Sequence, residues 1–149
     1  MSTMQVAVVT GEREIYRGEA EMVVAPGVDG EMGILPHHAA LLTALKAGEM
    51  SIKLGGAEDD LFISGGFMEV YNNTVTVLAD AAEHAENIDQ SRAEEARHRA
   101  QARLAEAGDA RERAAISGEL ERAVARLRIV ETTRRRSSRR IQMPPSSDQ

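Results

Sequence analysis

The chain opens with short apolar runs separated by turn residues, a pattern typical of an antiparallel β domain. The runs lie at residues 6–9, 22–25, 61–63, 67–71 and 75–78. The last two alternate between apolar and polar positions, and the dipeptide Asn72-Asn73 between them suits a tight hairpin turn. Because no helical pattern intervenes, these runs predict a sandwich or barrel-like sheet over residues 1–86.

The core of this domain should be small, because a chain of this length buries limited apolar surface. We expect its main members to come from the last three runs, as Phe62, Phe67, Val70, Val75 and Val77. The pair Gly65-Gly66 predicts a bulge or a close approach of backbones. A phosphate-binding loop is the alternative, but no Lys-Ser or Lys-Thr pair follows it and no helical pattern begins there.

After residue 86 the pattern becomes helical. The stretch up to residue 107 is rich in Ala, Glu and Arg, which are strong helix formers, and Asn87 with Gln90 predicts its N-terminal cap. Gly108-Asp109 separates it from a second helical pattern over residues 111–133. Each helix has one apolar stripe: Ala93, Ala96, Ala100, Leu104 and Ala107 on the first, and Ile116, Leu120, Ala123, Leu127 and Val130 on the second. An alanine seam buries little apolar area, so the hairpin should leave a docked position at modest cost.

Charge divides the chain in the same place. Residues 1–86 carry 14 acidic and 4 basic side chains, whereas residues 87–149 carry 10 acidic and 14 basic ones, all of them Arg. We therefore expect a domain with a sandwich or barrel-like sheet at residues 1–86, a helical hairpin at residues 87–133 and a basic, disordered tail at residues 134–149.

Several function classes are excluded or disfavoured. The absence of cysteine excludes disulfides, thiolate metal sites and a cysteine nucleophile. No apolar run approaches the ~20 residues that span a bilayer, and the N-terminus lacks a signal-peptide pattern, so we expect a soluble protein or one docked on a membrane complex. The four His residues lack metal-ligand spacing, and no phosphate loop or nucleophile motif is present, so we expect neither a metal site nor catalysis.

Candidate chemistry lies on the two helices. Asp89, Arg92 and Arg99 fall on one face of the first helix, and Arg122 and Arg126 share a face of the second. In an antiparallel hairpin these guanidinium groups can converge, and a guanidinium binds phosphate oxygens bidentately. The alternative is a solvated surface, with Asp89 favourable to the helix dipole and the Arg side chains paired to neighbouring glutamates.

Four motifs in order resemble the epsilon subunit of F-type ATP synthases. They are Gly30-Glu31-Met32-Gly33-Ile34-Leu35-Pro36-His37-His38-Ala39, Ser64-Gly65-Gly66-Phe67-Met68-Glu69-Val70, Val75-Thr76-Val77-Leu78-Ala79-Asp80 and Ile88-Asp89-Gln90-Ser91-Arg92-Ala93. The resemblance covers about residues 4–133. It implies an α+β fold, with an N-terminal antiparallel β-sandwich followed by a C-terminal two-helix antiparallel hairpin. It also implies a non-catalytic rotor subunit on the cytoplasmic face of the bacterial inner membrane.

The same resemblance implies partners and site residues. The β-sandwich would join the gamma subunit and the membrane rotor c-ring, and the extended helices would meet the alpha/beta catalytic heads and block ATP hydrolysis. No cofactor is required, but ATP is implied as a regulatory ligand of the folded-down hairpin. The residues matching the family's ATP site are Glu83, Ile88, Asp89, Arg92, Ala93, Arg99, Arg122 and Arg126.

Contact with the rotor ring is implied for Glu31, Met32, Gly33 and His38, on what we expect to be an irregular surface loop at residues 30–38. The sequence departs from the family pattern at His37, where Gly is usual, and at Ala40, where Pro is common.

Two other functions remain open. One is a stand-alone ATP-sensing module that regulates another partner. The other is a nucleic-acid-binding protein that uses the Arg-rich tail, which the overall acidity and the lack of aromatic residues in the basic half disfavour. We therefore expect no nucleic acid among the partners and contact with the membrane only through the complex.

Overall fold

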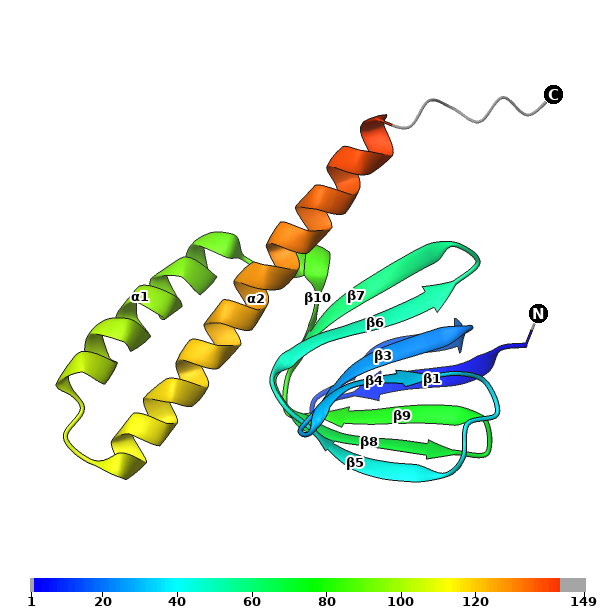
Figure 1. Cartoon of the computed structure of the whole chain (residues 1–149), viewed down its shortest axis with the longest axis horizontal. Coiled ribbons are helices and arrows are strands. Elements are labelled where there is room, and N and C mark those ends of the chain that lie inside the picture. The colour runs from blue at the N-terminus through cyan, green and yellow to red at the C-terminus, as the bar shows by residue number, and fades with distance from the viewer. Residues whose placement is uncertain (1, 143–149) are drawn as a thin grey trace.

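The computed structural model describes residues 2–142, and the side chains of residues 2–136. A β-sandwich is followed by two antiparallel helices, so the predicted α+β fold class is confirmed (Figure 1). The strands are β1 (Met4–Val9), β2 (Glu14–Ala20), β3 (Met22–Gly27), β4 (Gly30–Ile34), β5 (Leu41–Leu45), β6 (Gly48–Leu54), β7 (Ala57–Ile63), β8 (Gly66–Tyr71), β9 (Thr74–Ala79) and β10 (Ala82–His84). The helices are the 3₁₀ turn η1 (Ala85–Asn87), α1 (Gln90–Glu106) and α2 (Ala110–Gln142).

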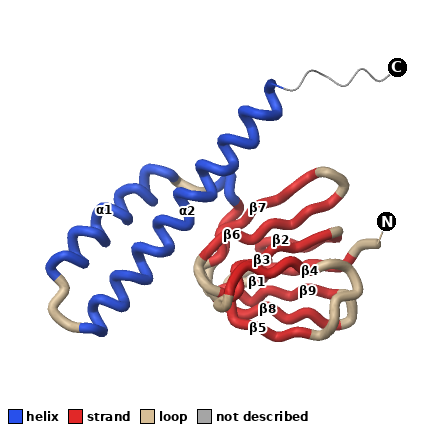
Figure 2. The backbone as a smooth tube through the Cα atoms, in the orientation of Figure 1, coloured by secondary structure: helices blue, strands red, loops and turns tan. Residues whose placement is uncertain are grey.

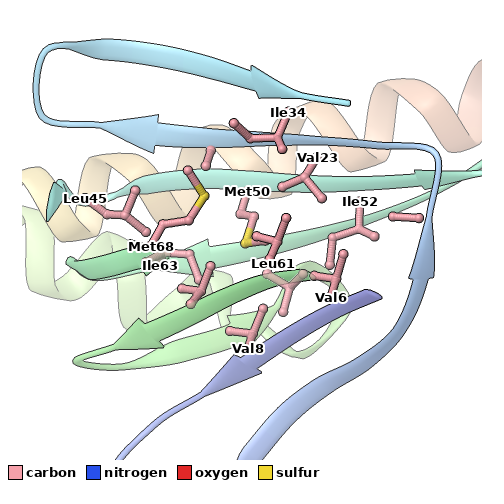
Figure 3. Packing of buried hydrophobic residues seen from close by; sticks show 14 of the residues in the cluster. Val6, Val8, Val23, Ile34, Leu45, Met50, Ile52, Leu61, Ile63 and Met68 are labelled. Carbon is pink, nitrogen blue, oxygen red and sulfur yellow. The ribbon is translucent and has the colours of Figure 1, made fainter. Parts of the chain in front are cut away.

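The strands form a folded-over sheet around one apolar core. Their order is β10-β7-β6-β3-β5-β8-β9-β1-β2, with β4 paired to β3. β3 meets β5 through the single pair Gly27 and Leu45, and there the sheet turns from one layer to the other. The inward faces of both layers interdigitate, as Figure 3 shows for Val6 and Val8 on β1 and Leu61 and Ile63 on β7. Figure 2 shows the helices lying to one side of this strand domain.

The hairpin turn between β8 and β9 lies at Asn72-Asn73, as the sequence predicts. Asn72 and Asn73 have φ values of 50° and 58°, and this left-handed backbone at both central positions is what a tight type I′ turn requires. The Asn73 side chain also accepts a hydrogen bond from the His37 backbone N–H at 2.8 Å and donates one to the Thr3 carbonyl at 2.9 Å. Asn73 therefore connects the β8–β9 turn to the loop that contains His37 and to the N-terminal segment at Thr3, at the end of the sandwich away from the helices.

Gly66 confirms the predicted close approach of backbones. Its φ is +138°, and a Cβ added there would lie 2.1 Å from the Leu78 carbonyl oxygen on β9. Phe67, the next residue, was predicted to be a core residue, and that prediction is wrong because its side chain is 57% exposed. Side chains alternate along a strand, so Phe67 must face away from the core when Met68 and Val70 face into it.

The cap of the first helix lies two residues later than predicted. Asn87 ends the 3₁₀ turn, and the N-cap is Asp89, whose Oδ1 accepts a hydrogen bond from the Arg92 backbone N–H at 3.1 Å. Asp and Asn are similarly good caps, so the composition alone did not decide between them. The predicted seam is confirmed, since Ala93 and Ala100 on α1 and Ile116 and Ala123 on α2 are buried.

The second helix is longer than predicted. It continues past Thr133 to Gln142, so the stretch up to that residue is helical rather than part of the disordered tail. Three contacts favour the extension: Arg135 pairs with Glu131 one turn back at 2.6 Å, Arg134 donates to Gln90 at 2.6 Å, and Arg136 reaches the sandwich. Arg is also a strong helix former and is favourable near a helix C-terminus. Residues 143–149 of the predicted tail lie outside the described residues.

The segment expected as an irregular loop at residues 30–38 is only partly one. Gly30–Ile34 is the strand β4, which pairs with β3 in register from Val23–Ile34 to Gly27–Gly30. The irregular part begins after Ile34, and there His37 adopts a φ of 63°. A left-handed backbone at this position explains why a glycine is usual there in the family that the sequence resembles.

Candidate functional site

A pocket lies where the base of the helical hairpin meets the sandwich. It has a volume of about 340 Å³ and is lined by residues from β10, η1, α1 and α2. Its lining consists of Glu83, Asn87, Asp89, Arg92, Ala93, Ala96 and Arg126. Five of the eight residues predicted to bind ATP thus come together in one hollow, although they span 43 positions of the chain.

Two of these residues form the start of α1. The Asp89 Oδ1 is occupied by the Arg92 backbone N–H, which fixes the first turn of the helix and leaves the carboxylate exposed. The Arg92 side chain is exposed and lines the same pocket. An exposed guanidinium beside a helix N-terminus is an arrangement suited to an anion.

Arg126 connects α2 to the sandwich. Its Nη2 donates to Glu83 Oε1 on β10 at 3.1 Å, and its guanidinium carbon lies 4.3 Å from the centre of the Phe62 ring on β7. The Arg126 side chain is only 26% exposed, so the ion pair is less screened than one on an open surface. A planar cation stacked on an aromatic face and paired with a carboxylate is held in one orientation.

The remaining predicted ATP residues lie outside the pocket lining. Ile88 is half-buried and packs against the cluster of Phe62, Ala85 and Ile129 that joins the hairpin to the sandwich. Arg99 is exposed on α1 two turns beyond Arg92, and Arg122 is half-buried one turn before Arg126 on α2. The rise of 1.5 Å per residue puts each within about 6–11 Å, along its helix axis, of an Arg that does line the pocket.

A second polar contact holds the far half of α2. Arg136 pairs with Glu58 on β7, with 3.2 Å between Nη1 and Oε1, and also contacts Asp60 on the same strand. Asp60 is almost fully buried, and its Oδ1 accepts a hydrogen bond from Ser51 Oγ at 2.9 Å. Burial, with the negative charges of Asp60 and Glu58, raises the pKa of the nearby Glu49 carboxyl to about 7, against the opposing charge of Arg136.

The residues predicted to contact the rotor ring are distributed along and beyond β4. Glu31 is exposed near the β3–β4 turn, where it lines a groove shared with α2. Met32 is half-buried against the core, and Gly33 is exposed with Met22 3.1 Å from where its Cβ would be. His38 is exposed past the opposite end of the strand, where its backbone N–H donates to the Leu35 carbonyl at 3.2 Å.

Sequence comparison provides the family. Residues 3–85 match the family model described as the ATP synthase delta/epsilon chain β-sandwich domain, and residues 86–131 match that of the long α-helix domain. The chain belongs to this family. A relative from Dehalococcoides mccartyi named ATP synthase epsilon chain is 48% identical over 136 residues, which cover 91% of this chain and 97% of the relative. One of the same name from Halorhodospira halophila is 45% identical over 141 residues, covering 93% and 100% of the two chains.

Solved structures agree on the fold of this epsilon-chain family member. A chain in the mitochondrial ATP synthase of Euglena gracilis superimposes with a TM-score of 0.75 at 23% identity, over 89% of this chain and 82% of that one. A chain in the central stalk and c-ring structure from Tetrahymena thermophila gives a TM-score of 0.60 at 14% identity, over 87% and 97%. Within residues 2–142, no helix combines the length and apolar character needed to cross a membrane.

The face of α2 that contacts the sandwich was not predicted from the sequence. Arg126, Ile129, Thr133 and Arg136 recur at steps of three, four and three, which is the spacing of one helix face. Only the apolar stripe toward α1 was recognised, because Thr and Arg in the second stripe hide its periodicity. Phe62, buried under this stripe rather than in the sandwich core, is the partner that the stripe needs.

Proposed function

We propose that this epsilon-chain family member is a rotor subunit of an F-type ATP synthase, in which its hairpin binds ATP when docked and restrains ATP hydrolysis when released. The observation that supports this best is the pocket at the hairpin base, which gathers Glu83, Asp89, Arg92, Ala93 and Arg126. The proposal places the protein on the cytoplasmic face of the bacterial inner membrane, attached through the complex.

The chemistry of the pocket suits a nucleoside triphosphate. Arg92 and Arg126 enter it from opposite helices and can together bind the polyphosphate, with Arg99 and Arg122 within reach further along. The free oxygen of Asp89 and the carboxylate of Glu83 can accept hydrogen bonds from the ribose or the amino group of adenine. Because the lining comes from α1, α2 and β10, ATP would bind only while the hairpin is docked, and it would stabilise that state.

The hairpin is held to the sandwich by a small interface, which supports its proposed mobility. The apolar part consists of Phe62, Ala85 and Ile129, with Ile88 and Ala125 packed around them. The polar part consists of the Arg126–Glu83 pair and the contacts of Arg136 with Glu58 and Asp60. After release, the Arg side chains of α2 would be available to acidic surfaces on the alpha/beta catalytic heads.

The outer face of the sandwich supports the proposed contact with the gamma subunit. Leu42, Phe67 and Leu78 are 71%, 57% and 58% exposed on the adjacent strands β5, β8 and β9. Phe67 pairs directly with Leu78, and Leu42 lies diagonally across from Phe67 on the same face. Large exposed apolar side chains grouped on one sheet face support its use as a protein interface.

Of the residues implied for c-ring contact, His38 lies near the β8–β9 turn, because its neighbour His37 donates to Asn73 in that turn, whereas Glu31 lines the groove shared with α2. The end of the sandwich with the β8–β9 turn, away from the helices in Figure 1, is the proposed site of c-ring contact.

Calorimetric titration of the isolated protein with ATP tests the nucleotide site. We expect saturable binding that is lost in Arg92→Ala and in Arg126→Ala, and retained in Arg113→Ala, an exposed position near the opposite end of α2. Absence of binding at millimolar ATP would refute the ATP site. Binding of ATP without association with the gamma subunit would instead favour a stand-alone ATP-sensing module.

A further inference from the structure

The far half of α2 makes a contact that the family comparison does not cover. The helix-domain match ends at residue 131, whereas the helix continues and places Arg136 against the β6–β7 hairpin. We propose that Arg136, with Glu58 and Asp60, forms a latch that sets how readily α2 leaves the sandwich. This inference deepens the proposed function, because it concerns the release of the same hairpin.

The latch has the geometry of a specific contact. The Asp60 side chain is 7% exposed and that of Glu58 is 26% exposed, whereas Arg136 is 44% exposed at the end of a long side chain. Ser51 orients Asp60 through a hydrogen bond, so the carboxylate is fixed before Arg136 arrives. Removing Arg136 would leave a buried carboxylate whose charge is no longer balanced, which is costlier than losing an exposed pair.

The absence of cysteine provides a direct assay of release. Ala85 is 8% exposed and packs with Phe62 and Ile129, so in the full chain the single variant Ala85→Cys has a thiol that reagent reaches when α2 leaves. In this background Arg136→Gln should accelerate thiol labelling about fivefold or more. The matched control is Arg135→Gln, whose parent side chain is 74% exposed and pairs within its own helix, and it should label at the parent rate.

A double-substitution cycle keeps the test independent of general destabilisation. If Arg136 acts through the buried carboxylate, adding Arg136→Gln to Asp60→Asn should produce a smaller acceleration than Arg136→Gln produces in the parent, and the pair with Glu58 accounts for the remainder. Equal rates in Arg136→Gln and Arg135→Gln, or fully additive effects of Arg136→Gln and Asp60→Asn, would overturn the latch. Because the assay contains no ATP, its failure leaves the ATP titration unaffected, and failure of that titration leaves the latch standing.

Discussion

Ile129 is the residue whose truncation tests the docking interface most sharply. It is 1% exposed and packs in one cluster with Phe62 and Ala85, where α2 contacts the sandwich. Ile129→Ala removes three carbon atoms from this contact, worth about 2.4 kcal/mol at 0.8 kcal/mol per buried methylene. The adjoining groove, which Ile129 also lines, allows neighbours to relax, so we expect the low end of the range for core truncations, about 2–3 kcal/mol.

The assay is hydrogen exchange of the intact protein, followed on peptides from the C-terminal half of α2. A loss of 2–3 kcal/mol should raise the opening constant of these peptides about 30- to 150-fold, with little change in peptides from β8 and β9. The control is Val124→Ala on the same helix, where the parent side chain is 36% exposed. Ile129→Val should fall in between. Equal effects of Ile129→Ala and Val124→Ala on α2 would refute the assigned interface.

Two further predictions concern the sandwich. Gly66→Ala would place a methyl group 2.1 Å from the Leu78 carbonyl oxygen at a backbone φ of +138°. Thermal unfolding should therefore show a free energy of unfolding lower by about 3 kcal/mol or more, whereas the control Gly11→Ala, whose added methyl meets nothing within 4 Å, should lower it by less than 1 kcal/mol. Phe67→Ser on the exposed face should leave the melting temperature nearly unchanged but weaken association with the gamma subunit at least tenfold in a binding titration; unchanged affinity would remove that face from the interface.

Local patterns predicted the fold well where short-range chemistry decides it. The Asn72-Asn73 turn and the alanine seam of the hairpin are each specified by adjacent or periodically spaced residues. Phe67 was predicted as a core residue together with Val70, but residues three apart on a strand face opposite sides of the sheet. The alternation that buries Met68 and Val70 therefore requires Phe67 to face outward.

The candidate site was predictable only in part, because its contacts join distant segments. Helix-face spacing indicated Arg126, whereas Glu83 was named only through the family resemblance, and nothing local in the sequence indicates that the two form an ion pair. The extension of α2 beyond Thr133 depends on Arg134 meeting Gln90 and Arg136 meeting the sandwich. Because the sequence does not show those partners, the arginine-rich composition alone predicts a disordered tail.

The central claim is that ATP binds the docked hairpin in preference to the released one. Thiol labelling of the Ala85→Cys protein, measured with and without ATP, tests it most directly. We predict that saturating ATP slows labelling in the parent background and has no effect when Arg92→Ala is added, because a ligand shifts an equilibrium only by its differential affinity for the two states. Labelling that proceeds at the same rate with and without bound ATP would contradict the claim.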